Sequence, residues 1–212
     1  MSAQRNSDSV PAASSSSWQS ARLLVTDEFA APPVILRVGD SVIGTLGNFS
    51  ASTGKAKSKK TFNVCAIVAA AMTGGTVLNY SASLPPRKRR ILYVDTEQSR
   101  FHCKRVLCRI LRLAGLPTDA HPPLLEFLCL RGYATKERLR KIEEAIYDLD
   151  NLGLVVIDGI RDLAHDINSP GEATDLITKL MQWTDERRIH IHTVLHLNKG
   201  DDNTRGHLGT EL

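Results

Sequence analysis

The chain has 212 residues, of which 42% are hydrophobic and 24% are charged. A chain of this size and composition can close one substantial core, which excludes the collagen-like, wholly disordered and mini-protein classes. The formal net charge is +4, from 27 Lys and Arg against 23 Asp and Glu. This mild basic bias permits phosphate or nucleic-acid partners without requiring them.

The sequence predicts no membrane partner. Its longest uninterrupted apolar run, residues 64–72, is far shorter than the roughly 20 residues that cross a bilayer, and the N-terminus lacks an export signal. There is no CxxC pair, and the cysteines lie inside apolar segments: Cys65, Cys103, Cys108 and Cys129. We therefore expect a cytoplasmic protein with reduced core cysteines.

The first 20 residues differ in composition from the remainder of the chain. Residues 1–20 are rich in Ser, Ala, Asn and Gln, which predicts a disordered segment, and we expect one domain over residues 21–212. From Val34 onward, short β-branched runs alternate with longer stretches of helical periodicity. That alternation predicts an α/β fold with a mostly parallel sheet flanked by helices.

Two strands, 34–38 and 41–46, are expected to form an N-terminal β-hairpin, because the intervening Gly-Asp pair favours a tight turn. An Ala-rich helix over 61–72 follows and ends at a Gly-Gly pair. The later expected elements alternate: strand 91–94, helix 103–114, strand 124–130, helix 136–149, strand 154–157, helix 172–187 and strand 189–197. Five strands with right-handed helical crossovers would make a doubly wound core.

A Gly-, Ser- and Lys-rich loop before residue 62 fits the phosphate-loop pattern G-x-x-x-x-G-K-[ST] at every position but one. The nucleotide-binding residues would be Gly54, Lys55, Ala56, Lys57, Ser58, Lys59, Lys60, Thr61 and Phe62. Backbone N–H groups would wrap a phosphate, Lys60 would reach the β- and γ-phosphates, and Thr61 would give a hydroxyl to Mg²⁺. Lys59 replaces the second glycine, where a left-handed backbone costs about 1 kcal/mol. The alternative is a solvated basic loop.

Three polar residues lie at or just beyond the ends of predicted strands, at the sheet edge where ligands bind in open α/β folds. Asp158 is suited to orient a Mg²⁺ shell or, alternatively, to end a strand in a turn. Glu97 is suited to polarise an attacking water as general base, or to cap the next helix. His196 would contact the γ-phosphate or the attacking water. Alternatively, its side chain has only a structural role, with its hydrogen bonds made within the fold.

Two further patterns are weaker. His190 and His192 lie on one face of a strand, but no third ligand is identifiable, so we expect them to pack in the core. The basic run 87–90 is typical of a solvated surface or a strand-edge guard, and is otherwise a plausible DNA-facing surface. No aromatic platform for stacking single-stranded bases accompanies it.

The ordered motifs resemble those of the RecA-like P-loop ATPases of the RepA, DnaB and KaiC type, especially RepA-like AAA ATPases of bacterial plasmids and mobile elements. The resemblance extends from about Val34 to the C-terminus. It rests on the phosphate loop, Asp-Thr-Glu-Gln, Ile-Asp-Gly and His-Leu-Asn-Lys. It implies ATP and Mg²⁺ as ligands. The residues it assigns are Lys60, Glu97 and His196 to catalysis, and Thr61 and Asp158 to the metal.

The resemblance also implies assembly. Relatives form hexameric rings or filaments on single-stranded DNA, and a mobile segment would begin near Arg205. The core of the family continues with further strands beyond the fifth. We therefore expect a truncated or degenerate relative, with Arg161 and Arg205 as the candidates for an arginine finger.

We expect a protein that binds and hydrolyses ATP, of the replicative-helicase type, with weak activity as a monomer because RecA-type sites lie between subunits. One alternative is a regulatory or accessory module that binds nucleotide with little hydrolysis. Another is an interacting fragment that no longer binds nucleotide. Turnover stimulated by DNA separates the first two, and a thermal shift with Mg·ATP excludes the third.

Overall fold

The structure, a computed structural model, describes residues 17–54, 59–166 and 169–196. By its internal contacts the chain divides into two units, Met1–Ala31 and Pro32–Leu212.

In the first unit, the expected disordered segment lies outside the described residues up to residue 16. The described part begins with a short 3₁₀ helix, η1 (Ser17–Ala21). The side chains of Leu23, Val25 and Phe29 beyond it are exposed.

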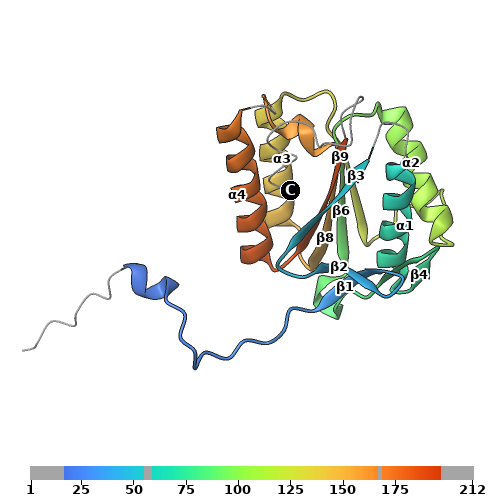
Figure 1. The fold of residues 1–212 in the computed structure, drawn as a ribbon. Coiled ribbons are helices and arrows are strands. Elements are labelled where there is room, and N and C mark those ends of the chain that lie inside the picture. Colours follow the sequence, from blue (N-terminus) through green and yellow to red (C-terminus); the bar gives the residue numbers. More distant parts are fainter. Residues whose placement is uncertain (1–16, 55–58, 167–168, 197–212) are drawn as a thin grey trace, which may run out of the picture. The chain divides into compact units, whose positions relative to one another are not determined.

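A five-stranded parallel sheet lies at the centre of the second unit (Figure 1). In spatial order its strands are β3 (Phe49–Gly54), β9 (His190–His196), β8 (Leu152–Asp158), β6 (Arg90–Asp95) and β7 (Leu125–Cys129). All seven residues of β8 are buried, as expected for a β-branched strand covered on both faces. The predicted α/β fold with a RecA-like P-loop core is confirmed.

Helices cover both faces of this sheet (Figure 1). One face carries α1 (Lys60–Thr73) and α2 (Arg100–Leu113), and the other carries α3 (Thr135–Asp148) and α4 (Pro170–Arg187). Each predicted helix is present, with ends that differ by at most three residues. Two 3₁₀ turns, η2 (Pro86–Lys88) and η3 (Ile160–Leu163), join the elements.

A second, antiparallel sheet packs beside α1. It contains β2 (Ser41–Thr45), β1 (Val34–Val38), β5 (Tyr80–Ala82) and β4 (Thr76–Val77) in spatial order. The predicted hairpin is present as the β1–β2 pair. The sequence prediction missed β4 and β5, because strands of two and three residues are too short to show a period.

One prediction about the parallel sheet is wrong. No strand was predicted between residue 46 and the phosphate loop, whereas β3 lies there and leads into the loop; the expected strand 41–46 is β2 and belongs to the other sheet. The sequence of β3 is Phe-Ser-Ala-Ser-Thr-Gly, which is small and polar, so hydrophobicity alone does not reveal a strand. Its hydroxyls bond to buried histidines of β9: Ser50 contacts His190 and His192.

Candidate functional site

The carboxyl ends of β6 and β8 bring two acidic residues together. Asp95 and Asp158 are direct partners in the parallel ladder between these strands. A cavity of about 320 Å³ opens beside them. Its lining residues are Thr61, Asp95, Glu97, Gln98, His102, Arg105, Val106, Arg109 and Asp158. Three residues chosen from separate motifs, Thr61, Glu97 and Asp158, therefore share one cavity.

The described part of the predicted phosphate loop consists of its two ends. Gly54 ends β3 and Lys59 precedes α1, while the predicted binding residues 55–58 lie outside the described residues. Lys59 has φ 62° and ψ 22°, and its side chain is exposed. Lys59, which replaces the second glycine of the pattern, therefore has the left-handed backbone conformation. Among the described residues no side chain caps α1, and the N–H groups of Phe62 and Asn63 donate to the carbonyl oxygen of Lys59.

Lys60 is the buried basic group of the site. Its side chain is 7% exposed, and its Nζ donates a hydrogen bond to the carbonyl oxygen of Gly54 at 2.6 Å. Burial lowers the pKa of Lys60, while the charges of Asp158 and Glu97 act in the opposite direction. The ammonium group thus bonds the residue at the end of β3 and is affected by the charges of Asp158 and Glu97. Phe62, the next residue but one, has a half-exposed ring.

Asp158 accepts two hydrogen bonds on one oxygen. Thr61 Oγ1 donates to Asp158 Oδ2 at 3.1 Å, and Tyr93 Oη donates to the same oxygen at 2.9 Å. Burial raises the pKa of Asp158 to about 6; the two hydroxyl bonds oppose this shift, and nearby Asp95 and Glu97 add to it. Burial disfavours the charged form of this carboxylate, and a bound cation would stabilise that form.

Asp95 shapes the turn that carries Glu97. Its Oδ1 accepts the backbone N–H groups of Glu97 at 3.0 Å and Gln98 at 2.7 Å, and its Oδ2 accepts Gln98 Nε2 at 2.7 Å. Glu97 itself is exposed at the cavity. Ser99 precedes α2, and among the described residues no side chain caps that helix, so the alternative of Glu97 as a helix cap is wrong.

The turn after β8 requires glycine. Gly159 has φ 99°, and a Cβ added there would lie 2.3 Å from Thr96 Oγ1 and 2.8 Å from Glu97 Cγ. Thr96 Oγ1 in turn donates to the Gly159 carbonyl oxygen at 2.8 Å. The side chain of Glu97 therefore lies against the backbone of Gly159, where any larger residue would displace it.

The positive wall of the cavity comes from α2, and the sequence prediction missed it. His102, Arg105 and Arg109 all line the cavity, at a spacing that puts them on one helix face. Burial raises the pKa of Cys65, one turn after Thr61 on α1, to about 11, although the charge of Arg109 acts to lower that pKa. The basic i, i+4 pair was visible in the sequence, but α2 was interpreted from its apolar stripe alone.

Other predicted residues lie at or beyond the edge of the described site. His196 ends β9, and its backbone pairs with Gly54, while nothing is described of its side chain. Arg205 lies outside the described residues, and Arg161 is exposed on η3 and does not line the cavity.

The expectation that His190 and His192 pack in the core is confirmed. Both are buried, and burial lowers the pKa of His190 to about 4 and of His192 to about 3. They bond Ser50 and Ser52 of β3. Within the described ranges, no group of three or more His, Cys, Asp or Glu side chains is placed to hold a metal ion.

The basic run 87–90 lies at the amino end of β6, opposite the cavity. Lys88 is part of the fold, since its Nζ donates to the Arg187 carbonyl oxygen, and burial lowers its pKa. Part of this run therefore holds the sheet to α4.

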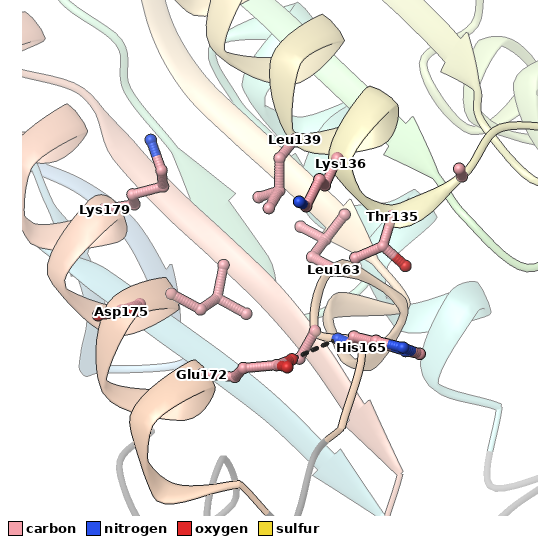
Figure 2. Close-up of a pocket in the computed structure, with 11 residues that line it drawn as sticks. Thr135, Lys136, Leu139, Leu163, His165, Glu172, Asp175 and Lys179 are labelled. Carbon is pink, nitrogen blue, oxygen red and sulfur yellow. Dashed lines mark hydrogen bonds between the residues drawn. The ribbon is translucent and has the colours of Figure 1, made fainter.

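A larger, mostly apolar hollow of about 740 Å³ lies between α3, η3 and α4 (Figure 2). Leu139, Leu163 and Leu176 line it, and at its mouth Glu172 Oε2 accepts the His165 backbone N–H at 2.6 Å. None of the predicted site residues lines this hollow, so it is separate from the polar cavity.

A family model described as AAA domain matches residues 19–202, a range that includes every predicted nucleotide-binding, catalytic and metal-binding residue but not Arg205. A search of curated proteins found no match to the chain. Among the helices that the structure describes, none is both long and apolar enough to cross a membrane.

Proposed function

The chain belongs to the AAA domain family, a family of nucleotide-binding ATPases, and we propose on that premise that the polar cavity binds Mg·ATP and hydrolyses its γ-phosphate. The observation that carries this proposal is the hydrogen bond between Thr61 and Asp158 inside a cavity that Glu97 also lines. This bond joins Thr61, which follows the loop residue Lys60, to Asp158 at the end of β8. A P-loop site requires a hydroxyl and a carboxylate in these two places to hold Mg²⁺.

The residues present fit a magnesium ion. Mg²⁺ in nucleotide sites uses one or two carboxylates and takes its remaining oxygen ligands from water and phosphate. Asp158 and Thr61 offer a carboxylate and a hydroxyl side by side, and the raised pKa of Asp158 marks a buried acid that a cation would help to ionise. When bound, Mg²⁺ would neutralise phosphate charge.

Each remaining residue has a proposed role. The backbone of the loop from Gly54 to Thr61, with Phe62 after it, would hold the nucleotide, and Lys60 would move from the Gly54 carbonyl to the β- and γ-phosphates. Glu97 would accept a proton from the attacking water, since its side chain is exposed at the cavity while its backbone is fixed by Asp95.

The α2 wall supplies positive charge from within the same chain. Arg105 and Arg109 face a cavity that contains Asp95, Glu97 and Asp158. We assign these arginines to the γ-phosphate, whose charge three carboxylates alone would repel. His196, which its backbone pairing places beside Gly54, would report the state of the γ-phosphate to the chain beyond it.

Finer features remain part of the proposal. The domain would extend over residues 21–212 and would act as a replicative-helicase ATPase of the RepA, DnaB and KaiC type, in a ring or filament on single-stranded DNA. The second candidate, a regulatory module with little hydrolysis, is favoured by one observation. Lys59 holds the strained left-handed conformation that a glycine would adopt freely.

Nucleotide titration of the full chain tests the proposal. Lys60→Ala should abolish Mg·ATP binding, and Glu97→Gln should retain binding while turnover falls by about a hundredfold or more. Lys104→Ala, which removes an exposed lysine of α2 outside the cavity, is the matched control. Equal loss of binding in Lys60→Ala and Glu97→Gln would contradict the roles. Turnover stimulated by single-stranded DNA would favour the helicase over the regulatory module.

A further inference from the structure

Two cysteines from different elements meet beneath the turn that carries Glu97. The Sγ atoms of Cys103 on α2 and Cys129 at the end of β7 are 3.4 Å apart. Both thiols also lie 3.6 Å from the carbonyl oxygen of Gln98. Both are free thiols.

The two thiols differ in access. Cys103 is 4% exposed, whereas Cys129 is half-buried and lines an open hollow together with Arg100, Arg131 and Tyr133. A small oxidant can therefore reach the thiol of Cys129 through this hollow. Cys103 lies directly behind it, in the position of a resolving thiol.

We propose that Cys103 and Cys129 form an oxidative modification site, in which a hydroperoxide converts the pair to a disulfide. The sulfur of Cys129 attacks the terminal oxygen of the peroxide, the O–O bond breaks, and Cys129 becomes a sulfenic acid, while the departing oxygen takes the Cys129 thiol proton and leaves as water or an alcohol. The sulfur of Cys103 then attacks the sulfenic sulfur, the S–S bond forms, and the departing hydroxide takes the Cys103 proton as water. Two thiols lose two electrons in total, and the peroxide gains them.

The geometry requires a small movement. A disulfide has an S–S length of about 2.05 Å, so the two sulfurs must approach from their present 3.4 Å. Burial raises the pKa of Cys103 well above its usual range, with Cys129 and Asp95 adding to the effect. We therefore expect the second step to be the slower one, and the Cys129 sulfenic acid to be an observable intermediate.

The link would also bear on the polar cavity. Cys129 is the ladder partner of Asp95, whose carboxylate fixes the Glu97 backbone, and Cys103 lies in the first turn of α2. A covalent tie between them would restrain the turn that presents Glu97. This second consequence rests on the proposed nucleotide site, whereas the modification itself does not.

The test treats the folded full chain with hydrogen peroxide and maps its peptides by mass spectrometry without reduction. We expect a cross-linked pair of peptides containing Cys103 and Cys129, a loss of two thiols, and reversal by dithiothreitol. Cys103→Ser should stop at a Cys129 sulfenic acid that dimedone traps. Cys108→Ser, which removes another half-buried thiol of α2, should leave the cross-link unchanged.

Two results would overturn the proposal. One is oxidation of Cys108 before Cys129, and the other is over-oxidation of Cys129 in the wild-type chain without any cross-link. Both are read from the wild-type chain, so they hold even where a serine variant fails to fold. Reduced chain that binds no Mg·ATP would refute the proposed function and leave this mapping intact. If reduced chain binds Mg·ATP, we expect at least a threefold change in Kd on cross-linking, and an unchanged Kd would contradict the restraint of the Glu97 turn.

Discussion

Thr61 and Asp158 are 97 residues apart in the chain, yet the Thr61 hydroxyl donates a 3.1 Å hydrogen bond to the Asp158 carboxylate. The bond joins the first turn of α1 to the end of β8. It places two oxygen atoms suited to magnesium next to one another, so these two groups need little rearrangement to share a magnesium ion.

Removing the Thr61 hydroxyl should therefore weaken binding of Mg·ATP. A hydrogen bond to a charged group contributes about 1.5–3 kcal/mol, so Thr61→Ala should raise the Kd by a factor of ten or more. Thr61→Ser keeps the hydroxyl and should stay within about threefold of wild type. Titration calorimetry at several Mg²⁺ concentrations measures both. Equal effects of Ala and Ser would show that the methyl group, not the hydroxyl, matters.

The raised pKa of Asp158 predicts how stability depends on pH without nucleotide. Its pKa moves from an ordinary 3.8 to about 6, so the folded chain holds this proton more tightly than the unfolded chain. The stabilisation is full below pH 3.8 and is lost as the pH rises through 6, a total of about 2–3 kcal/mol. Asp158→Asn should therefore gain stability relative to wild type by that amount between pH 3.5 and 7.5. Urea unfolding of both chains at each pH measures the difference, and a difference independent of pH would contradict it.

The left-handed backbone at Lys59 predicts a stabilising substitution. Lys59→Gly should raise the free energy of unfolding by about 0.5–1 kcal/mol, because glycine adopts φ 62° without a Cβ penalty. Lys59→Ala removes the same charge and keeps the Cβ, so it should bring no comparable gain. Denaturant unfolding of the three chains decides. If Ala stabilises as much as Gly, charge repulsion rather than backbone strain limits this position.

A side chain at residue 159 should displace Glu97. Gly159→Ala should cost at least about 2 kcal/mol of stability, from the positive φ and from a contact of 2.3 Å to Thr96 Oγ1. Among variants that still fold, turnover should fall more than nucleotide affinity, since Glu97 moves while Lys60 does not. Gly132→Ala is the control, because a Cβ there meets nothing within 4 Å. Thermal unfolding and steady-state kinetics provide the two measurements.

The positive wall of α2 should distinguish ATP from ADP. Arg109→Ala should weaken ATP by about tenfold and ADP by much less, because the missing charge would face the γ-phosphate. Arg109→Lys should restore part of the loss, and Lys104→Ala should change neither affinity. Fluorescence titration with both nucleotides measures the ratio. An unchanged ratio would show that Arg109 does not face the γ-phosphate.

Much of this site could be predicted because its acidic residues come after apolar strands in the sequence. Asp158 comes directly after Leu-Val-Val-Ile, and Glu97 follows Ile-Leu-Tyr-Val, so burial and strand end are visible in the sequence. The carboxyl ends of parallel strands meet at one edge, which explains why the two acids share a cavity.

What the sequence did not predict depends on partners from other elements. The strand β3 is small and polar, and its stability as a strand comes from pairing with β9 and from bonds to His190 and His192. Arg105 and Arg109 line the cavity only because α2 packs against α1. The tight fit at Gly159 depends on Thr96, more than sixty residues earlier.

The buried histidine pair sets an acid limit on the molecule. An unfolded chain would take up protons on both imidazoles near pH 6.5, whereas the folded chain resists until about pH 4 for His190 and about pH 3 for His192. Acidification below pH 6.5 therefore draws the equilibrium toward the unfolded chain. Both imidazoles lie where β3 pairs with β9, and β3 leads into the phosphate loop. Folding of this part of the sheet is therefore favoured when both imidazoles are neutral.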